Sequence, residues 1–253
     1  GRSVQRLGAD AAGAGEHTLL ARGEYERGIR TELPPITGDM HPLGDPWISY
    51  CIYHNNTCLP GVLGVIVVLT AIFSIGSEIK RATSREWLKT ADDNILLAIL
   101  GKLLPQTLLF FLMGALCQLL LYGYFGFPLQ NGIGPMLAAM LLFVMALQGV
   151  SIFFICMAPS LRIALSMGGL FGVVSFSLAG ISFPAEAMYP TFHLLTDILP
   201  LRHYFIIYAD QALNGVPLYY SRIHYMALFI YALLPLPFLP LLKRALHSQV
   251  YVA

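Results

Sequence analysis

Residues 59–77 read LPGVLGVIVVLTAIFSIGS and contain no charged side chain. A helix that crosses a bilayer needs about 20 predominantly apolar residues, and this stretch has that length. Proline suits the first turn of a helix, where its missing N–H leaves no hydrogen bond unmade, so Pro60 fits the start of such a helix. The stretch therefore predicts a membrane-spanning helix.

The composition extends this prediction to most of the chain. The 253 residues are 57% apolar and 11% charged, whereas soluble domains carry about 25% charge. The net charge of +1 gives no bulk field that favours nucleic acid. We predict an all-α polytopic membrane protein in contact with the lipid bilayer, with five spans: 59–77, 95–124, 133–157, 163–183 and 225–242.

The first 58 residues differ from the remainder. They are polar, include a Pro/Gly-rich stretch at 33–39, and have two short strand-like segments at 29–33 and 47–53. We interpret residues 1–58 as the remnant of an external α/β domain and residues 59–253 as the transmembrane domain. No cleavable signal opens the chain, so we expect that it lacks an N-terminal part with an upstream helix.

Basic residues are distributed unevenly among the loops. The loop between the first two predicted spans has four, the loop at 123–132 has none, and two follow the last span. Cytoplasmic loops carry an excess of Lys and Arg. We therefore expect loop 78–94 and the C-terminus to be cytoplasmic and residues 1–58 to be outside. The basic residues concerned are Lys80, Arg81, Arg85, Lys89, Lys243 and Arg244.

Loop 78–94 is the most charged segment beside a span. Ile79, Thr83 and Trp87 recur at a spacing of four, which predicts a short amphipathic helix at the membrane interface. The loop is either an ordinary charged connection anchored by its tryptophan or a docking surface for a cytoplasmic partner. The candidate docking residues are Glu78, Lys80, Arg81, Arg85, Glu86 and Trp87.

Residues 184–222 are unusually apolar for an outer loop. Two short helices broken at Pro200 would form a re-entrant hairpin, which is tolerated where protein buries its backbone. The alternative is a sixth span over 201–213, against which Arg202 and Asp210 argue. The histidines of the segment show no metal-ligand spacing. The candidate residues of the hairpin are Phe183, Pro184, Pro200, Arg202 and His203.

Small residues and cysteines leave two questions open. Gly168 and Gly172 form a small-xxx-small pattern and Gly180 follows, which suits close helix packing either within the chain or between two copies. Cys51 and Cys58 are either free thiols or a disulfide, because spacing in sequence does not establish bond geometry.

Several function classes lack the residues they require. Lys102 is the ionisable residue within the predicted spans, and it lies near the cytoplasmic end, which argues against ion-coupled transport and intramembrane proteolysis. No P-loop motif occurs, so any driving ATP is bound by another subunit. We assign no catalytic, metal-binding or cofactor-binding residues and do not expect an enzyme.

Several motifs together resemble one family, the ABC-2 type transporter permeases, over about residues 29–245. The charged segment Glu78–Lys89 stands where that family has its cytoplasmic segment. The other matching elements are GDPW at 44–47, CLPGVLG at 58–64, GKLLP at 101–105, ISFP at 181–184, MYP at 188–190 and LPLRHY at 199–204.

The resemblance implies a permease subunit of a multidrug-type exporter in a bacterial inner membrane. Two subunits, identical or different, would pair, a cytoplasmic ABC ATPase subunit would dock on residues 78–94, and a periplasmic adaptor protein is a further expected partner. The rival hypotheses are a non-transporting membrane scaffold and a membrane-embedded enzyme acting on lipid, for which no cluster of polar catalytic groups is found.

Overall fold

The computed structural model describes residues 50–179 and 195–248, with side chains from Asn55 on, and these ranges are helical without strands. Two turns are π-helical, η1 (Leu120–Tyr124) and η3 (Ala209–Leu213), and η4 (Leu236–Phe238) is a 3-10 turn. The α-helices are α2 (Tyr50–Lys80), α3 (Ser84–Thr90), α4 (Ile95–Leu119), α5 (Ile133–Met157), α6 (Leu161–Leu178), α8 (Pro200–Tyr208), α9 (Leu218–Leu233) and α10 (Leu239–Ser248).

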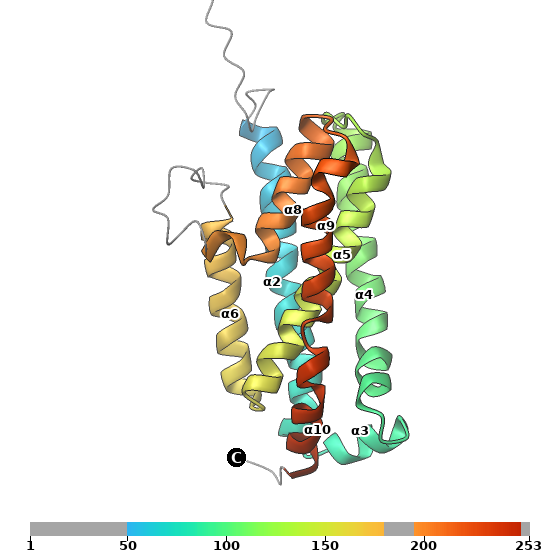
Figure 1. Ribbon diagram of the computed structural model, residues 1–253, viewed down its shortest axis with the longest axis vertical. Helices are drawn as coiled ribbons and strands as arrows, with labels where there is room; N and C mark the ends of the chain where they lie inside the picture. Colours follow the sequence, from blue (N-terminus) through green and yellow to red (C-terminus); the bar gives the residue numbers. More distant parts are fainter. Residues whose placement is uncertain (1–49, 180–194, 249–253) are drawn as a thin grey trace, which may run out of the picture. The chain divides into compact units, whose positions relative to one another are not determined.

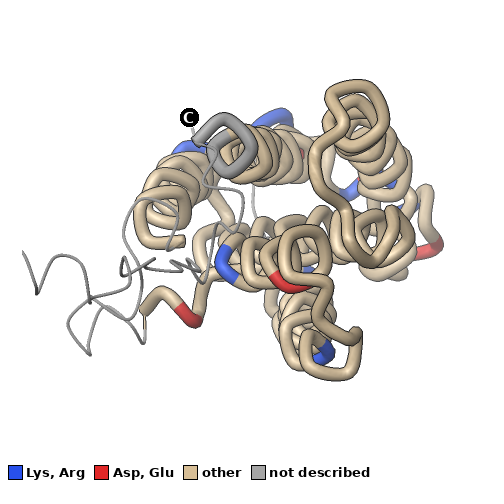
Figure 2. The backbone as a smooth tube through the Cα atoms, turned by 90° about the horizontal axis from the view of Figure 1, so that it is seen from above, with Lys and Arg blue, Asp and Glu red and all other residues tan. Residues whose placement is uncertain are grey.

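Within residues 50–179 and 195–248, five helical segments are long and apolar enough to cross a bilayer, which confirms the prediction of an all-α polytopic membrane protein. The fifth is composite, because α9, η4 and α10 follow one another along it (Figure 1). Seen end-on, the described helices carry few charged residues (Figure 2). The segments are Asn55–Lys80, Ile95–Tyr124, Ile133–Met157, Leu161–Leu178 and Leu218–His247.

Two helices begin earlier in the chain than predicted. α2 starts at Tyr50 rather than at Leu59, so the strand prediction for 47–53 is wrong for its described part, 50–53. No Gly or Pro interrupts 50–59, and the helix therefore continues outward, leaving Pro60 inside it. α9 starts at Leu218 rather than at Tyr225. The predicted external domain up to residue 49 and the first part of the hairpin lie outside the described residues.

The helical start of α2 also bears on its two cysteines. Cys51 and Cys58 are both in α2. At about 1.5 Å rise per residue, seven residues separate their Cα atoms by about 10 Å along the axis. A disulfide needs Cα atoms within about 7 Å. A continuous helix over 51–58 therefore keeps these two Cα atoms farther apart than that limit.

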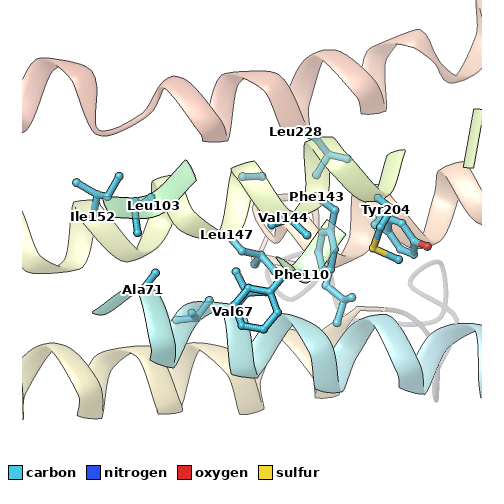
Figure 3. Close-up of a cluster of buried hydrophobic side chains, with 14 of the residues drawn as sticks. Val67, Ala71, Leu103, Phe110, Phe143, Val144, Leu147, Ile152, Tyr204 and Leu228 are labelled. Atoms are coloured by element: carbon cyan, nitrogen blue, oxygen red, sulfur yellow. The ribbon is translucent and has the colours of Figure 1, made fainter. Parts of the chain in front are cut away.

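Helix α5 forms the centre of the described bundle. In the most apolar 18-residue stretch of α5, 67% is buried inside the protein, whereas the corresponding share for the other four segments is 22–44%. The neighbouring helices therefore surround α5. It packs against α2, α4, α8 and α9. Figure 3 shows the result, with Phe143 of α5 beside Tyr204 of α8, their ring centroids 4.9 Å apart.

Glycines allow two pairs of these helices to approach closely. A Cβ atom on Gly149 of α5 would lie 2.2 Å from the carbonyl oxygen of Tyr231 in α9, which is a clash with backbone. On α6, a Cβ on Gly168 would meet the Ile72 side chain at 2.5 Å, and one on Gly172 would meet Val65 at 2.9 Å. The small-xxx-small pattern of α6 thus faces α2 of the same chain, whereas Gly180 lies outside the described residues.

The outward face of α4 is a row of leucines. Leu100, Leu104, Leu108, Leu112 and Leu116 follow one another at a spacing of four and are each 50–62% exposed. Four-residue spacing places them on one side of the helix. Apolar side chains on the outside of a helix bundle suit a bilayer, because the hydrocarbon core around them contains no water.

Candidate functional site

The charged segment between α2 and α4 folds as a turn, a short helix and a second turn at one end of the bundle (Figure 1). α2 ends at Lys80, and Ala82 has a φ of 58°, so the helix does not continue. The predicted amphipathic helix through Ile79, Thr83 and Trp87 is therefore wrong as a single element. The Thr83 hydroxyl instead donates to the Glu78 carboxylate, which closes the turn.

Helix α3 has one buried face. Ser84 and Leu88, at a spacing of four, are 3% and 1% exposed, and Trp87 is half-buried beside them. The Asn94 side chain then caps α4 by accepting from two backbone N–H groups, at 3.1 and 3.4 Å. The segment is therefore packed onto the bundle and ends where α4 begins.

A charged residue inside α4 ties the segment to two helices. The Lys102 ammonium pairs with the Glu78 carboxylate at the end of α2 and lies 5.0 Å from the centroid of the Trp87 ring. Both groups of the pair are only about a quarter exposed, which weakens solvent screening. Lys102 thus joins α2, α3 and α4 through one ion pair and one cation–π contact.

Helix α3 and the turn that follows it also hold α10, through what we call the α3–α10 contact (Ser84, Arg85, Asp93, Lys243 and His247). The Ser84 hydroxyl donates to the Leu246 carbonyl at 3.2 Å, and the Arg85 guanidinium donates twice to the His247 carbonyl, at 2.7 and 3.2 Å. From α10, Lys243 pairs with Asp93 at 2.7 Å, and His247 lies 3.1 Å from the same carboxylate.

The electrostatics of this contact centre on Asp93. Hydrogen bonding from Lys243 holds the pKa of the Asp93 carboxyl below its ordinary value, and the charge of Lys243 and the contact with His247 act in the same direction. The pair is open to solvent, so its net contribution to stability is small. Asp93 nevertheless contacts two side chains of α10.

The structure brings together some of the predicted docking residues and separates others. Glu78 and Trp87 meet at Lys102, and Arg85 is directed to α10. Lys80, Arg81 and Glu86 are exposed and, among the described residues, form no ion pair. Lys89 is exposed as well. Sequence reasoning gave Lys243 only a topological role and gave no role to Ser84, Asp93 or His247, because no local pattern signals a contact between the two ends of the domain.

The second predicted site is the hairpin, of which the structure describes the part from Leu195 on. Pro200 opens α8 at its first position, and the α8–η3 segment of 200–213 is too short to cross a bilayer at 1.5 Å per residue. It does not form a sixth span. Figure 1 shows α8 beside α9 over the part of the bundle away from α3. Phe183 and Pro184 lie outside the described residues.

The polar hairpin residues turn inward. Arg202 is 9% exposed, and its Nη1 lies 3.5 Å from the carbonyl oxygen of Ala179 at the end of α6. The Nδ1 atoms of His203 and His224 lie 3.1 Å apart, which joins α8 to α9. These side chains hold the hairpin against its neighbours.

A hydrogen-bond network fastens the same end of the bundle. Gln211 of η3 is fully buried, donates to the Ser221 hydroxyl at 2.8 Å, and accepts from the Asn131 amide at 3.0 Å. Ser221 in turn donates to the Asp210 carboxylate at 2.8 Å. The π-helical turn, the α4–α5 loop and α9 are thereby connected. No pattern in the sequence singled out these residues.

A family model described as ABC-2 type transporter matches residues 48–210, which run from before α2 to within η3 and include the whole α3 segment. The comparison with curated proteins gave no match, and neither did the comparison with solved structures.

Proposed function

Because this chain belongs to the ABC-2 type transporter family, we propose that it is the permease subunit of an ATP-driven exporter whose ATP is bound and hydrolysed by a separate ABC ATPase subunit. The family membership over residues 48–210 is the observation that carries the proposal. A second permease subunit completes the export pathway, and a periplasmic adaptor extends it. The location we propose is a bacterial inner membrane, with the C-terminus in the cytoplasm.

The α3 segment is the proposed contact with the ATPase. Its supporting features are its position in a short connection between two spans, its packed inner face and its exposed outer charges. A segment that passes on movement must be fixed to the spans, since otherwise it would yield locally. Lys102 with Glu78 and Trp87 supplies that attachment.

The geometry divides the charged residues of the segment into two roles, and Lys89 joins the residues that the sequence predicted. Arg81, Glu86 and Lys89 have exposed side chains that are available to a soluble partner. Arg85 is occupied by its two hydrogen bonds to His247. We therefore assign Arg81, Glu86 and Lys89 to the ATPase contact and Arg85 to the attachment of α10.

The test is co-purification of an ABC ATPase with the full-length permease from mild detergent. We expect the double charge reversal Arg81→Glu with Lys89→Glu to remove the ATPase and to abolish export while the permease still inserts. Arg162→Glu is the matched control, because Arg162 is an exposed charge in the first turn of α6, outside the α3 segment. Retention of the ATPase and of export in the double variant would refute the docking assignment.

The rival proposal is a scaffold that holds other membrane proteins without transporting. It predicts that a preparation which preserves complexes contains no ATPase. It also predicts that bulky substitutions among the spans leave complex formation and cell phenotype unchanged. The exporter proposal predicts loss of export from the same substitutions.

A further inference from the structure

A cavity of about 170 Å³ lies between α2 and α4, with α5 and α8 forming its inner wall. Val62 and Ile66 of α2 and Met113 of α4 line it and are 57%, 44% and 46% exposed, so they stand at its mouth. The cavity therefore opens sideways, between two membrane spans.

The mouth lies at the depth of the bilayer's hydrocarbon core. Val62 and Ile66 belong to the span Asn55–Lys80 and Met113 to the span Ile95–Tyr124, and each is within six positions of the middle of its span. At about 1.5 Å rise per residue, six positions correspond to about 9 Å. The hydrocarbon core is about 30 Å thick, so it extends about 15 Å to either side of its middle. Acyl chains, rather than headgroups, are therefore the parts of a lipid that meet the mouth.

The wall suits an apolar occupant better than water. It is almost wholly apolar, and its described lining holds no charged side chain. Its two amide side chains, Asn56 and Gln118, are only 5% and 3% exposed. Asn56 accepts from the Tyr122 hydroxyl at 2.9 Å, and Gln118 donates to the Tyr204 hydroxyl at 2.9 Å, so both are engaged with protein groups. A buried water needs two to four polar partners, which this wall does not present.

The volume and the surroundings identify the occupant. An apolar cavity of about 150 Å³ in another protein stays dry and binds benzene, and this cavity is close to that size. We propose that the cavity binds part of one acyl chain of a membrane phospholipid, which enters between α2 and α4 and lies against α5 and α8. The headgroup remains at the bilayer surface, because the wall offers no charge to receive it.

The inner wall supplies reporters for such a chain. Met140 of α5 and Tyr204 of α8 line the cavity but are only 2% and 3% exposed. A lipid that stays on the outside of the bundle does not touch them, whereas a chain inside the cavity does. Met140 is also an adaptable wall, since the methionine side chain is unbranched and flexible. Gly114 leaves room for it, because a Cβ there would lie 2.7 Å from the Met140 sulfur.

This binding site is separate from the α3 segment, and it needs neither an ATPase nor transport. Its test is therefore independent of the proposed function. A permease that fails to recruit an ATPase would still hold the chain, and a permease that exports normally would still fail the test if no chain enters the cavity.

The experiment uses the full chain in phosphatidylcholine nanodiscs that contain a phosphatidylcholine with a photoactivated diazirine on one acyl chain. Mass spectrometry then locates the cross-links. We expect labelling of Met140 and Tyr204 as well as of Leu116, which is 58% exposed on the outer row of α4. A phosphatidylcholine with the diazirine on its headgroup should label neither Met140 nor Tyr204.

Two variants narrow the mouth without disturbing the packed bundle, because they change exposed positions. Val62→Phe and Ile66→Phe should each reduce the labelling of Met140 and Tyr204 relative to Leu116. Leu112→Phe, on the exposed row of α4 and outside the cavity lining, is the matched control and should leave that ratio unchanged. Absence of label on both Met140 and Tyr204 in the wild type would overturn the proposal. Labelling of the inner wall that neither mouth variant reduces would overturn it too.

Discussion

Arg85 and His247 meet across 162 positions of sequence, where the guanidinium donates two hydrogen bonds to the carbonyl oxygen of His247. The last carbonyls of a helix have no donor within the helix, and His247 is in the last turn of α10. A basic side chain is a favourable partner at that position. The segment proposed to meet the ATPase is therefore joined to the end of the fifth span.

Removal of the Arg85 guanidinium should loosen α10. We expect Arg85→Ala to speed amide exchange in 84–90 and 239–248 by about two- to fivefold, since an exposed charged hydrogen bond contributes on the order of 0.5–1 kcal/mol. Hydrogen exchange with mass spectrometry measures this. Arg81→Ala is the control, because Arg81 is an exposed arginine in the turn just before α3. Equal protection in the two variants would show that the guanidinium does not hold α10.

The attachment of α10 should also depend on pH through Asp93. Its folded pKa is lowered, so its contribution is present above the unfolded value of about 3.9 and is lost as the pH falls through the folded pKa. At pH 6 we expect α10 to be more protected from amide exchange in the wild type than in Asp93→Asn, so that the ratio of the two protection values is above one. The ratio should fall toward one as the pH is lowered through the folded pKa of Asp93, below its unfolded value of about 3.9. It cancels the intrinsic pH dependence of exchange, and a ratio that stays constant would contradict the prediction.

The closest approach of α5 and α9 should tolerate no side chain. Gly149→Ala brings a methyl group against the backbone of Tyr231, and we expect a loss of about 1–3 kcal/mol, as for other overpacked cores. The midpoint of thermal unfolding in detergent measures it. Gly169→Ala is the matched control, since a Cβ there meets nothing within 4 Å. Gly168→Ala should fall between them, because Ile72 presents the flexible tip of its side chain.

The buried amide of Gln211 should be needed for the end of the bundle that holds the hairpin. Gln211→Ala leaves the Asn131 amide and the Ser221 hydroxyl with fewer partners, and we expect a loss of about 1–3 kcal/mol. Thermal unfolding again measures it. Gln130→Ala, an exposed glutamine in the neighbouring loop, should have no effect, and similar midpoints for both variants would count against the network.

The helical membrane architecture followed from local properties of the sequence. Long apolar stretches predict spans because the bilayer leaves backbone groups no partner except within a helix. The boundaries were less predictable. Helices α2 and α9 begin at Tyr50 and Leu218, within polar and aromatic residues that precede the apolar stretches. No Gly or Pro separates these residues from the apolar stretch, so the helix continues through them. The four-residue spacing of Ile79, Thr83 and Trp87 predicted one helix. That prediction is wrong because the backbone leaves the helical conformation at Ala82, between Ile79 and Thr83.

The sequence by itself determined that this chain is a helical membrane protein of a transporter family, since apolar length and short motifs are local properties. Only the tertiary structure decided what individual polar residues do. Arg85 faces His247, Lys102 faces Glu78, and Gln118 donates to the Tyr204 hydroxyl. Partners that are far apart in sequence leave no periodic signal along the chain, so their meeting depends on how the helices pack.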